Sequence, residues 1–372
     1  MENRLSMKAT SKELRILLIG YFGHGNLGDE MMLHAFLYGL RDRVKFSACA
    51  ISGSPDETRQ MHSIAAINKF NIASIVEFMR KADVVVGCGG SLLQDATSFR
   101  SLAYYVGLIV LSRSLGVAPV LLAQGLGPLR RRISRHLAAL ALRRCLLITF
   151  RDEVSLELAK KLCAVHDKAF LTADLAFILT PPYEAKPPQE NLWLAVAMRP
   201  WRGVDEVLAH VADGILQLKH RISAVRCISF SRDDIEVSEK LSLLLKQMKV
   251  EVVAPRSIEE LWEAMKSVHL LIGSRLHSLI LACMLGIPSI AISYDPKVEA
   301  FMKGWASRFC IPWEGVSSDA VKERLVECID GWRELRDNAM EFAHASKGLS
   351  KLNLELFLSK FHCPCSNGSE GT

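Results

Sequence analysis

The stretch RILLIGYFGHGNLGDEMMLHAF, residues 15–36, joins an apolar run to a glycine-rich turn and a helical pattern. Its first part, RILLIG, predicts a buried strand, and residues 29–40 predict the helix that comes next. Three glycines of the turn have the G-x-G-x-x-G spacing: Gly23, Gly25 and Gly28. A strand, a glycine turn and a helix in this order predict the first unit of a parallel α/β sheet.

The alternation of short apolar strands and helical patterns continues along the chain. After the strand KADVVVG comes a helix predicted from Ser91, and APVLLAQG and LLITF follow as further strands. Four prolines in TPPYEAKPPQE, residues 180–190, predict an interdomain linker. The alternation then restarts with LWLAVAM, and the second half repeats the plan of the first. The pattern predicts two Rossmann-like α/β domains with the active site in the interdomain cleft.

These signals divide the chain into four predicted segments. The two Rossmann-like domains cover residues 1–180 and 191–345, and a linker over residues 181–190 joins them. A C-terminal helix and a disordered tail make up residues 346–372.

Composition limits the classes of protein that fit. The chain has 372 residues and a net charge of +6, which suits anionic substrates or a membrane surface better than a nucleic-acid arm. Its ten cysteines are scattered through mostly apolar segments, as in a reducing compartment. The polar N-terminus lacks the apolar core of a signal peptide, and the longest apolar run stops at Arg113, too short to span a bilayer. We expect a cytoplasmic protein, with peripheral contact at the inner face of the plasma membrane.

The glycine turn does not complete a dinucleotide fingerprint. Such a fingerprint needs an acidic residue after the second strand, where this chain has Ser52-Gly53-Ser54. Asp29 and Glu30 also begin the helix whose amides would hold the pyrophosphate. Two interpretations stay open: a structural turn capped by Asp29, or backbone that approaches a hydroxylated ligand beside Asn26 and Asp29.

The sharpest anion-binding signal is GSRLHS, which comes after the strand HLLIG and opens a helix. Ser274 is the predicted N-cap, and Arg275 and His277 fall in the first turn, where free amides favour an anion. Arginine adds a bidentate fork for phosphate or carboxylate. Three more cations come directly after strand ends, where α/β sheets bind ligands: Arg151, Arg199 and Lys297.

Two further segments each have two interpretations. In GCGGSLLQD, Ser91 is the predicted helix cap, and Gln94 and Asp95 either bind sugar hydroxyls or tie the turn to its neighbours. Residues 129–144 carry six arginines on an amphipathic helix. This helix either presents a solvated face or docks to anionic lipid.

Taken together, six segments resemble the polysaccharide pyruvyl transferase family, and most closely its CsaB type. They occur in the expected order between residues 20 and 298: GYFGHGNLGDE, GCGGSLLQDATSFRSLAYY, LLAQGLGPL, FRDEVS, LTADLAF and GSRLHSLILACMLGIPSIAISYDPKV. The resemblance implies a GT-B-like fold that moves the enolpyruvyl unit of phosphoenolpyruvate onto a sugar as a ketal, releasing phosphate. It implies N-acetylmannosamine of a lipid-linked cell-wall polymer precursor as acceptor, and a ketal that anchors S-layer proteins.

The resemblance and the residues together give one predicted site. The resemblance implies that Arg275 and His277 handle the substrate. We predict no metal and no cofactor, with phosphoenolpyruvate as co-substrate on the C-terminal domain and the acceptor on the N-terminal domain. The phosphoenolpyruvate ligands are predicted to be Arg275, Arg199, Lys297 and Arg151. The acceptor ligands are predicted to be Gly25, Asn26, Asp29, Gln94 and Asp95.

Two other functions fit the same architecture. A GT-B glycosyltransferase with a nucleotide-sugar donor would also bind its donor on the C-terminal half, and Glu299 stands near the position expected for a ribose carboxylate. A non-catalytic sugar-binding protein would not need to keep Arg275 and His277. The sequence leaves the sugar, the polymer and the oligomeric state open.

Overall fold

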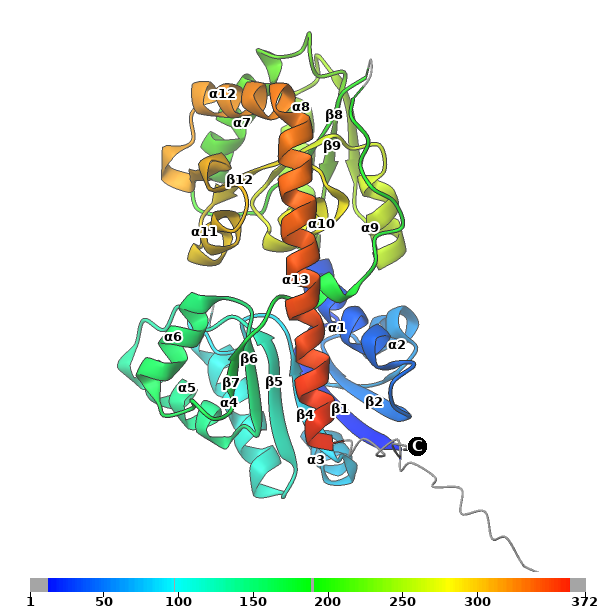
Figure 1. Ribbon diagram of the computed structural model, residues 1–372, viewed down its shortest axis with the longest axis vertical. Coiled ribbons are helices and arrows are strands. Elements are labelled where there is room, and N and C mark those ends of the chain that lie inside the picture. Colours follow the sequence, from blue (N-terminus) through cyan, green and yellow to red (C-terminus); the bar gives the residue numbers. More distant parts are fainter. Residues whose placement is uncertain (1–12, 97, 189–190, 362–372) are drawn as a thin grey trace, which may run out of the picture.

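The computed structural model describes residues 13–96, 98–188 and 191–361 and shows two α/β lobes, one above the other (Figure 1). Seven strands form the N-terminal sheet: β1 (Leu14–Phe22), β2 (Phe46–Ser52), β3 (Ala65–Asn68), β4 (Val84–Cys88), β5 (Ala118–Gln124), β6 (Leu147–Phe150) and β7 (Ala169–Leu171). Six strands form the C-terminal sheet: β8 (Trp193–Ala197), β9 (Ala224–Ile228), β10 (Lys249–Val253), β11 (Leu270–Gly273), β12 (Ser289–Ser293) and β13 (Cys310–Pro312).

The C-terminal sheet repeats the order of the first six strands of the N-terminal sheet, which has β7 in addition. The N-terminal sheet runs β3-β2-β1-β4-β5-β6-β7, and the C-terminal sheet runs β10-β9-β8-β11-β12-β13. The paired strands are parallel throughout both sheets. The predicted pair of Rossmann-like domains is therefore confirmed.

Helices cover both faces of each sheet. The N-terminal half has α1 (Leu27–Leu40), α2 (Pro55–His62), α3 (Ile72–Lys81), α4 (Phe99–Ser114), α5 (Arg132–Arg144), α6 (Glu153–Leu162) and the short helix η1 (Leu175–Ile178). The C-terminal half has α7 (Val204–Leu216), α8 (Ile235–Leu244), α9 (Ile258–Met265), α10 (Leu276–Leu285), α11 (Pro296–Lys303), α12 (Ser318–Asp330) and α13 (Trp332–Phe361). Alternate residues of β1 serve opposite faces: Ile16 and Leu18 pack with α1 and α13, whereas Leu17 and Ile19 pack with α3, α4 and α5.

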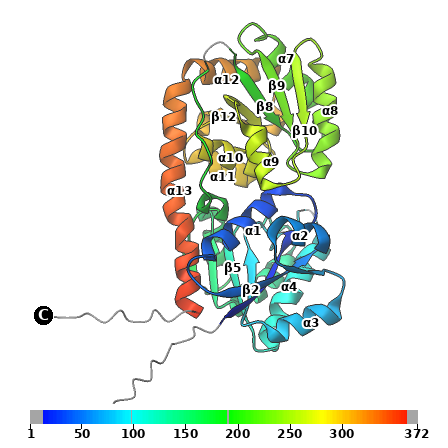
Figure 2. The same ribbon diagram turned by 90° about the vertical axis from the view of Figure 1, so that its right-hand side faces the viewer.

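The last helix, α13, connects the two halves. Its 30 residues run along both lobes without a break, through the predicted boundary between residues 345 and 346 (Figure 2). In the N-terminal half Phe357 packs edge-on against Phe36 of α1, with ring centroids 5.4 Å apart. Buried Asn353 accepts a hydrogen bond from Thr172 at 2.9 Å and donates one to the carbonyl of Ala173 at 3.0 Å. The helix thus fixes one half against the other.

Three helix starts differ from the sequence prediction. Ser91 caps no helix, because the chain stays in a loop to the cap Ser98, held by an isolated bridge between Leu93 and Leu126. Ser274 is buried and its hydroxyl accepts the backbone N–H of Arg199 at 3.0 Å, so the cap position passes to Arg275. The cap of α1 is Asn26, which accepts the N–H of Gly28 at 3.2 Å, and not Asp29.

Some predictions concern residues outside the described ranges. The polar N-terminus up to residue 12 and the cysteine-containing tail from residue 362 belong to these. Within the described ranges, none of the helices has both the length and the apolarity to cross a membrane.

Candidate active site

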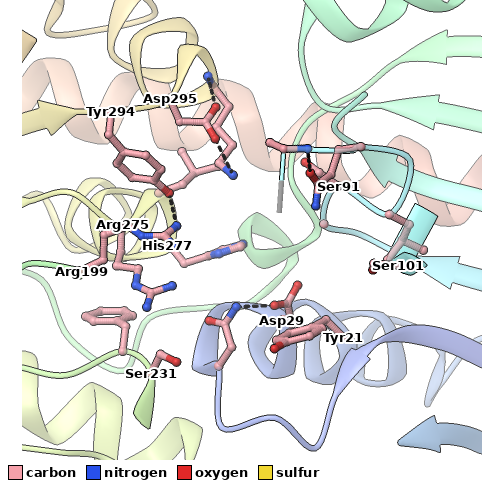
Figure 3. A pocket seen from close by; sticks show the side chains of 18 of the residues that line it. Tyr21, Asp29, Ser91, Ser101, Arg199, Ser231, Arg275, His277, Tyr294 and Asp295 are labelled. Carbon is pink, nitrogen blue, oxygen red and sulfur yellow. Dashed lines mark hydrogen bonds and ion pairs between the residues drawn. The ribbon is translucent and has the colours of Figure 1, made fainter. Parts of the chain in front are cut away.

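A cavity of about 370 Å³ lies between the two halves and is lined from both (Figure 3). Its walls are the segments at the carboxyl ends of β1, β4, β5 and β6 in one half and of β8, β9, β11 and β12 in the other. Both sheets therefore converge on it with the edge where parallel α/β sheets bind ligands. Eight of the predicted site residues line this cavity: Asn26, Asp29, Gln94, Arg151, Arg199, Arg275, His277 and Lys297.

Two predicted acceptor residues do not line the cavity. Asp95 accepts the backbone N–H groups of Arg130 at 2.8 Å and Arg131 at 3.1 Å, just before α5 begins. Gly25 lies at the contact between the halves, with φ of +68°, and its carbonyl accepts the N–H of Arg232 at 3.3 Å. The structure therefore gives Asp95 a role in the loop before α5 and gives Gly25 a role in joining the domains.

Arg275 is held by a buried carboxylate. Its guanidinium donates to both oxygens of Asp234, with Nε at 3.0 Å from Oδ2 and Nη2 on Oδ1. Asp234 is fully buried and also accepts the N–H groups of Phe230 and Ser231 at 3.1 and 3.0 Å. This network fixes the direction of Arg275 before any ligand arrives.

His277 lies where the two halves meet. A Cβ built on Gly28 would lie 2.1 Å from Nδ1 of His277, so only glycine allows the imidazole this close to α1. Its other nitrogen, Nε2, is buried without a hydrogen-bond partner among the residues that the structure describes. Nε2 lies 3.5 Å from Oδ2 of Asp174, a position from which a protonated imidazole gains an ion pair.

Asp174 links His277 to Arg151. Its Oδ2 accepts from Nη1 of Arg151 at 2.8 Å, and both side chains are buried. Burial alone would raise the pKa of Asp174, but His277, Arg151 and the N–H of Ala176 outweigh it and hold this pKa well below its usual range. Asp174 is therefore an ionised carboxylate, and it is positioned to stabilise positive charge on His277.

Asp29 faces His277 from the N-terminal half. Burial raises the pKa of Asp29 to about 6, and Glu30 adds to the rise while His277, Lys297 and Arg151 oppose it. The side-chain amide of Asn26 donates to Oδ2 of Asp29 and orients the carboxylate. An oriented carboxylate that titrates near neutral pH suits a general base.

The side chain of Glu30, unlike that of Asp29, binds neighbouring groups of the N-terminal half and does not line the cavity. It is buried, accepts from the N–H of Gly23 at 2.7 Å and pairs with Nε2 of His62 at 2.7 Å. The N–H groups of Asp29 and Glu30 are also engaged, by the carbonyl of Asn26. The N–H groups of Gly23, Gly28, Asp29 and Glu30, which a pyrophosphate at this turn would need, thus already have partners within the protein.

Aromatic rings surround Arg199. Its guanidinium carbon lies 4.6 Å from the ring centroid of Tyr294 and 5.4 Å from that of Trp201. Nη1 donates to the hydroxyl of Tyr294 at 2.5 Å, whereas Nε is buried without a partner among the described residues. Lys297 differs, because its ammonium group lies 3.1 Å from the carboxylate of Asp295, the cap of α11.

Several site residues were not predicted from sequence. These are the carboxylates that hold the arginines, Asp174 and Asp234, and the aromatic residues of the cavity wall, Tyr21, Trp201 and Tyr294. Asp174 stands inside LTADLAF, and that segment was available as a signal. Asp234 and Trp201 had no signal, because their partners Arg275 and Tyr294 come from other strands of the C-terminal sheet and meet them only in the folded domain.

Among the described residues, no group of three histidine, cysteine, aspartate or glutamate side chains could hold a metal ion. The prediction that no metal takes part stays a prediction.

The fold is GT-B-like, as solved structures show. A UDP-GlcNAc 2-epimerase from Neisseria meningitidis, bound to UDP-GlcNAc, superposes with a TM-score of 0.63 at 13% identity, covering 93% of this chain and 100% of that one. HepE from Anabaena, in complex with UDP and glucose, gives 0.64 at 14% identity, covering 94% and 100%. At such identities the likeness concerns the fold alone.

The sequence defines the class more closely. Residues 26–296 match the family model of polysaccharide pyruvyl transferases, and the chain belongs to this family. The amylovoran biosynthesis protein AmsJ of Erwinia amylovora is 25% identical over 362 residues, covering 78% of this chain and 86% of AmsJ. The protein is thus a transferase of the pyruvyl-transfer class, related to polysaccharide biosynthesis.

Proposed function

We propose that this protein transfers the pyruvyl group of phosphoenolpyruvate to two hydroxyls of one sugar as a ketal, and releases phosphate. The observation that carries the proposal is a single cavity that collects four cationic side chains around a histidine and a titratable carboxylate. The donor is anionic at two ends, and the reaction needs one acid and one base.

The donor binds mainly to the C-terminal half. Arg275, fixed by Asp234, offers a preset fork to the phosphate or the carboxylate. Arg199 keeps a buried N–H without a partner among the described residues, and this group is available to a donor oxygen. Lys297 and, across the cleft, Arg151 complete the positive wall.

His277 acts as the acid. It donates a proton to the methylene carbon, C3, of phosphoenolpyruvate, and C2 becomes an oxocarbenium-like centre. Asp174, 3.5 Å from Nε2, stabilises the protonated imidazole before transfer. Arg151 holds Asp174 in place for this role.

Asp29 acts as the base on the acceptor. It removes a proton from the first hydroxyl, which attacks C2; the C2–O bond to phosphate breaks, and the second hydroxyl closes the ketal. One of the two hydroxyl protons replaces the proton given to C3, and the other leaves with phosphate. Asn26, which orients Asp29, and Gln94 line the same wall and serve the sugar.

The finer assignment of the acceptor rests on the resemblance of the motifs. We propose N-acetylmannosamine of a lipid-linked cell-wall polymer precursor, modified at the cytoplasmic face of the membrane, with the ketal serving to anchor S-layer proteins. The name of AmsJ, an amylovoran biosynthesis protein, supports a polysaccharide acceptor in general.

The test is phosphate release from phosphoenolpyruvate against a panel of acceptor sugars, with N-acetylmannosamine glycosides included. We expect release to depend on one acceptor, to yield a product with the methyl signal of a pyruvate ketal, and to continue in EDTA. UDP-sugars in place of phosphoenolpyruvate form the second arm, because they test the glycosyltransferase alternative. Turnover of a UDP-sugar without use of phosphoenolpyruvate would overturn the proposal.

A further inference from the structure

The first turns of α3, α4 and α5 form one exposed surface beside the candidate active site. These three helices pack on the same face of the N-terminal sheet, in one apolar cluster. Each begins after the carboxyl end of a strand, so their N-terminal ends lie along the same edge. Figure 2 shows α3 and α4 on the side of the N-terminal lobe opposite α13. We call the surface made by residues 69–75, 98–104 and 128–135 the helix-start surface.

Large apolar side chains are exposed on the helix-start surface. The exposed fraction is 78% for Phe70, 56% for Ile72 and 57% for Ile133. Between α3 and α4 the surface opens into a second, mainly apolar cavity of about 410 Å³, whose lining includes Phe70 and Tyr104. Exposed apolar side chains around an apolar hollow indicate a contact site.

Cations surround these apolar groups. Five of the cationic residues of the surface are exposed arginines: Arg100, Arg130, Arg131, Arg132 and Arg135. The guanidinium of Arg131 lies 5.4 Å from the ring of Phe99, and the ammonium group of Lys69 lies 5.1 Å from that of Phe70. The three segments contain no aspartate or glutamate. The surface is therefore both apolar and strongly positive.

The surface also reaches the active-site cavity. Ser101 and Tyr105 of α4 line both cavities, and Pro128, just before α5, lines the first. Tyr104 donates to the carbonyl of Lys69 at 3.1 Å and so connects α4 to the turn before α3. A partner bound here would face the acceptor side of the catalytic cleft.

We propose that the helix-start surface docks the protein on an anionic phospholipid bilayer. Apolar side chains beside a cluster of cations match the chemistry of such an interface, where rings and aliphatic groups enter the headgroup layer and arginines meet lipid phosphates. The neighbouring carboxylate, Asp95, binds the N–H groups of Arg130 and Arg131, and the cations still outnumber it. The proposal does not depend on the proposed reaction, because it concerns binding alone. Its consequence for the reaction is that the acceptor wall of the cleft faces the membrane.

The experiment is sedimentation of the full-length protein with vesicles of phosphatidylcholine alone or mixed with phosphatidylglycerol. We expect binding to the mixed vesicles only, weakened by salt. A cation at an anionic surface contributes about fivefold to partitioning, so Arg100→Gln, Arg131→Gln and Arg132→Gln together should weaken binding about tenfold or more. The matched control has the same charge change on exposed residues of the other half: Lys219→Gln, Lys246→Gln and Arg333→Gln.

The apolar part has its own variants. Phe70→Ser with Ile133→Ser should weaken vesicle binding several-fold, whereas Leu243→Ser with Leu244→Ser, also exposed, should not. Equal losses in test and control variants, or failure of the parent protein to bind anionic vesicles at low salt, overturn the proposal. Self-association without vesicles that is lost in the Phe70 variant also overturns it, because the surface would then join two copies of this chain. Phosphate release from phosphoenolpyruvate, measured without vesicles, reports separately on the proposed function.

Discussion

The two halves share the order of six strands but differ in the segments that leave the strand ends. After β11 the chain enters α10 within three residues, so Arg275 and His277 stand directly at the strand end. After β4, its counterpart, the chain makes a loop through Ser91, Gln94 and Asp95 that carries no cation before α4 begins at Phe99. After β8 come Arg199 and Trp201, whereas Asn26 and Asp29 come after β1.

In both halves the sheet topology determines where the site residues lie, at the carboxyl ends of the strands. The side chains at those places determine which ligand each half can bind. Both sheets direct their strand ends at one cavity. The C-terminal half supplies three of its four Lys and Arg side chains, together with the carboxylates of Asp233 and Asp295. The N-terminal half supplies one carboxylate, Asp29, and is otherwise mostly amides and hydroxyls: Asn26, Gln94, Tyr21, Ser91, Ser101 and Tyr105. Arg151 is the exception, since it comes from the N-terminal half and reaches His277 through Asp174. The division suits an anionic donor on one side and a hydroxylated acceptor on the other.

Among the variants considered, replacement of His277 should lower kcat the most. A general acid contributes about 10²–10⁴ in rate, so His277→Gln should lower kcat by that factor while phosphoenolpyruvate still binds. Phosphate release and isothermal titration measure the two quantities, and His136→Gln, an exposed histidine on α5, is the control. A folded variant that turns over within a few-fold of the parent would exclude His277 as the acid.

The contribution of the N-terminal half, through Asp29, should be visible in the pH dependence of kcat. The base must be ionised, and the pKa of Asp29 is raised to about 6, so kcat should fall as the pH drops through that value. Asp29→Asn should lower kcat by about 10² and abolish this limb. A limb that persists in the variant assigns the ionisation to another group.

Donor affinity should depend on the C-terminal half. A charge-assisted hydrogen bond contributes about 1.5–3 kcal/mol, so Arg275→Ala should weaken phosphoenolpyruvate binding about tenfold or more. The variant also leaves Asp234 buried without its partner, and its thermal unfolding should be recorded in parallel. Arg202→Ala, on an exposed arginine after β8, is the matched control, and an unchanged Kd in the Arg275 variant places the anion elsewhere.

The smallest effect should come from Asp95. Its carboxylate binds two backbone N–H groups before α5, so Asp95→Ala should cost about 1 kcal/mol of stability, as loss of a cap does. Binding of phosphoenolpyruvate and the KM for the sugar should stay unchanged. A raised KM for the acceptor would restore the ligand role that the sequence suggested for Asp95.

Periodicity and turn chemistry were enough to predict the fold. Apolar runs such as RILLIG and HLLIG became buried strands, since few other elements bury so short a run on both faces. Helix starts were less predictable, because a serine at a strand end has two competing uses. Ser274 binds the backbone of Arg199 and does not cap α10, and that neighbour comes from another strand.

The cationic part of the site was predictable because arginine at a strand end has few structural uses. The carboxylates that position it were not, since Asp234 and Arg275 meet only after β9 and β11 have been brought into one sheet. Asp95, in contrast, was predicted as an acceptor ligand but does not line the cavity. Its neighbours in sequence resemble a ligand loop, but its carboxylate satisfies local amides.

Gly28 and His277 cannot vary independently. The imidazole occupies the volume where any side chain at residue 28 would begin. A residue larger than glycine at position 28 is compatible with the fold only if His277 is replaced by a smaller residue. Substitutions at the two positions are therefore epistatic, and their effects on stability do not add. The third glycine of the dinucleotide-like turn thus owes its identity to His277, the proposed acid, in the other half, and the pair should be inherited together.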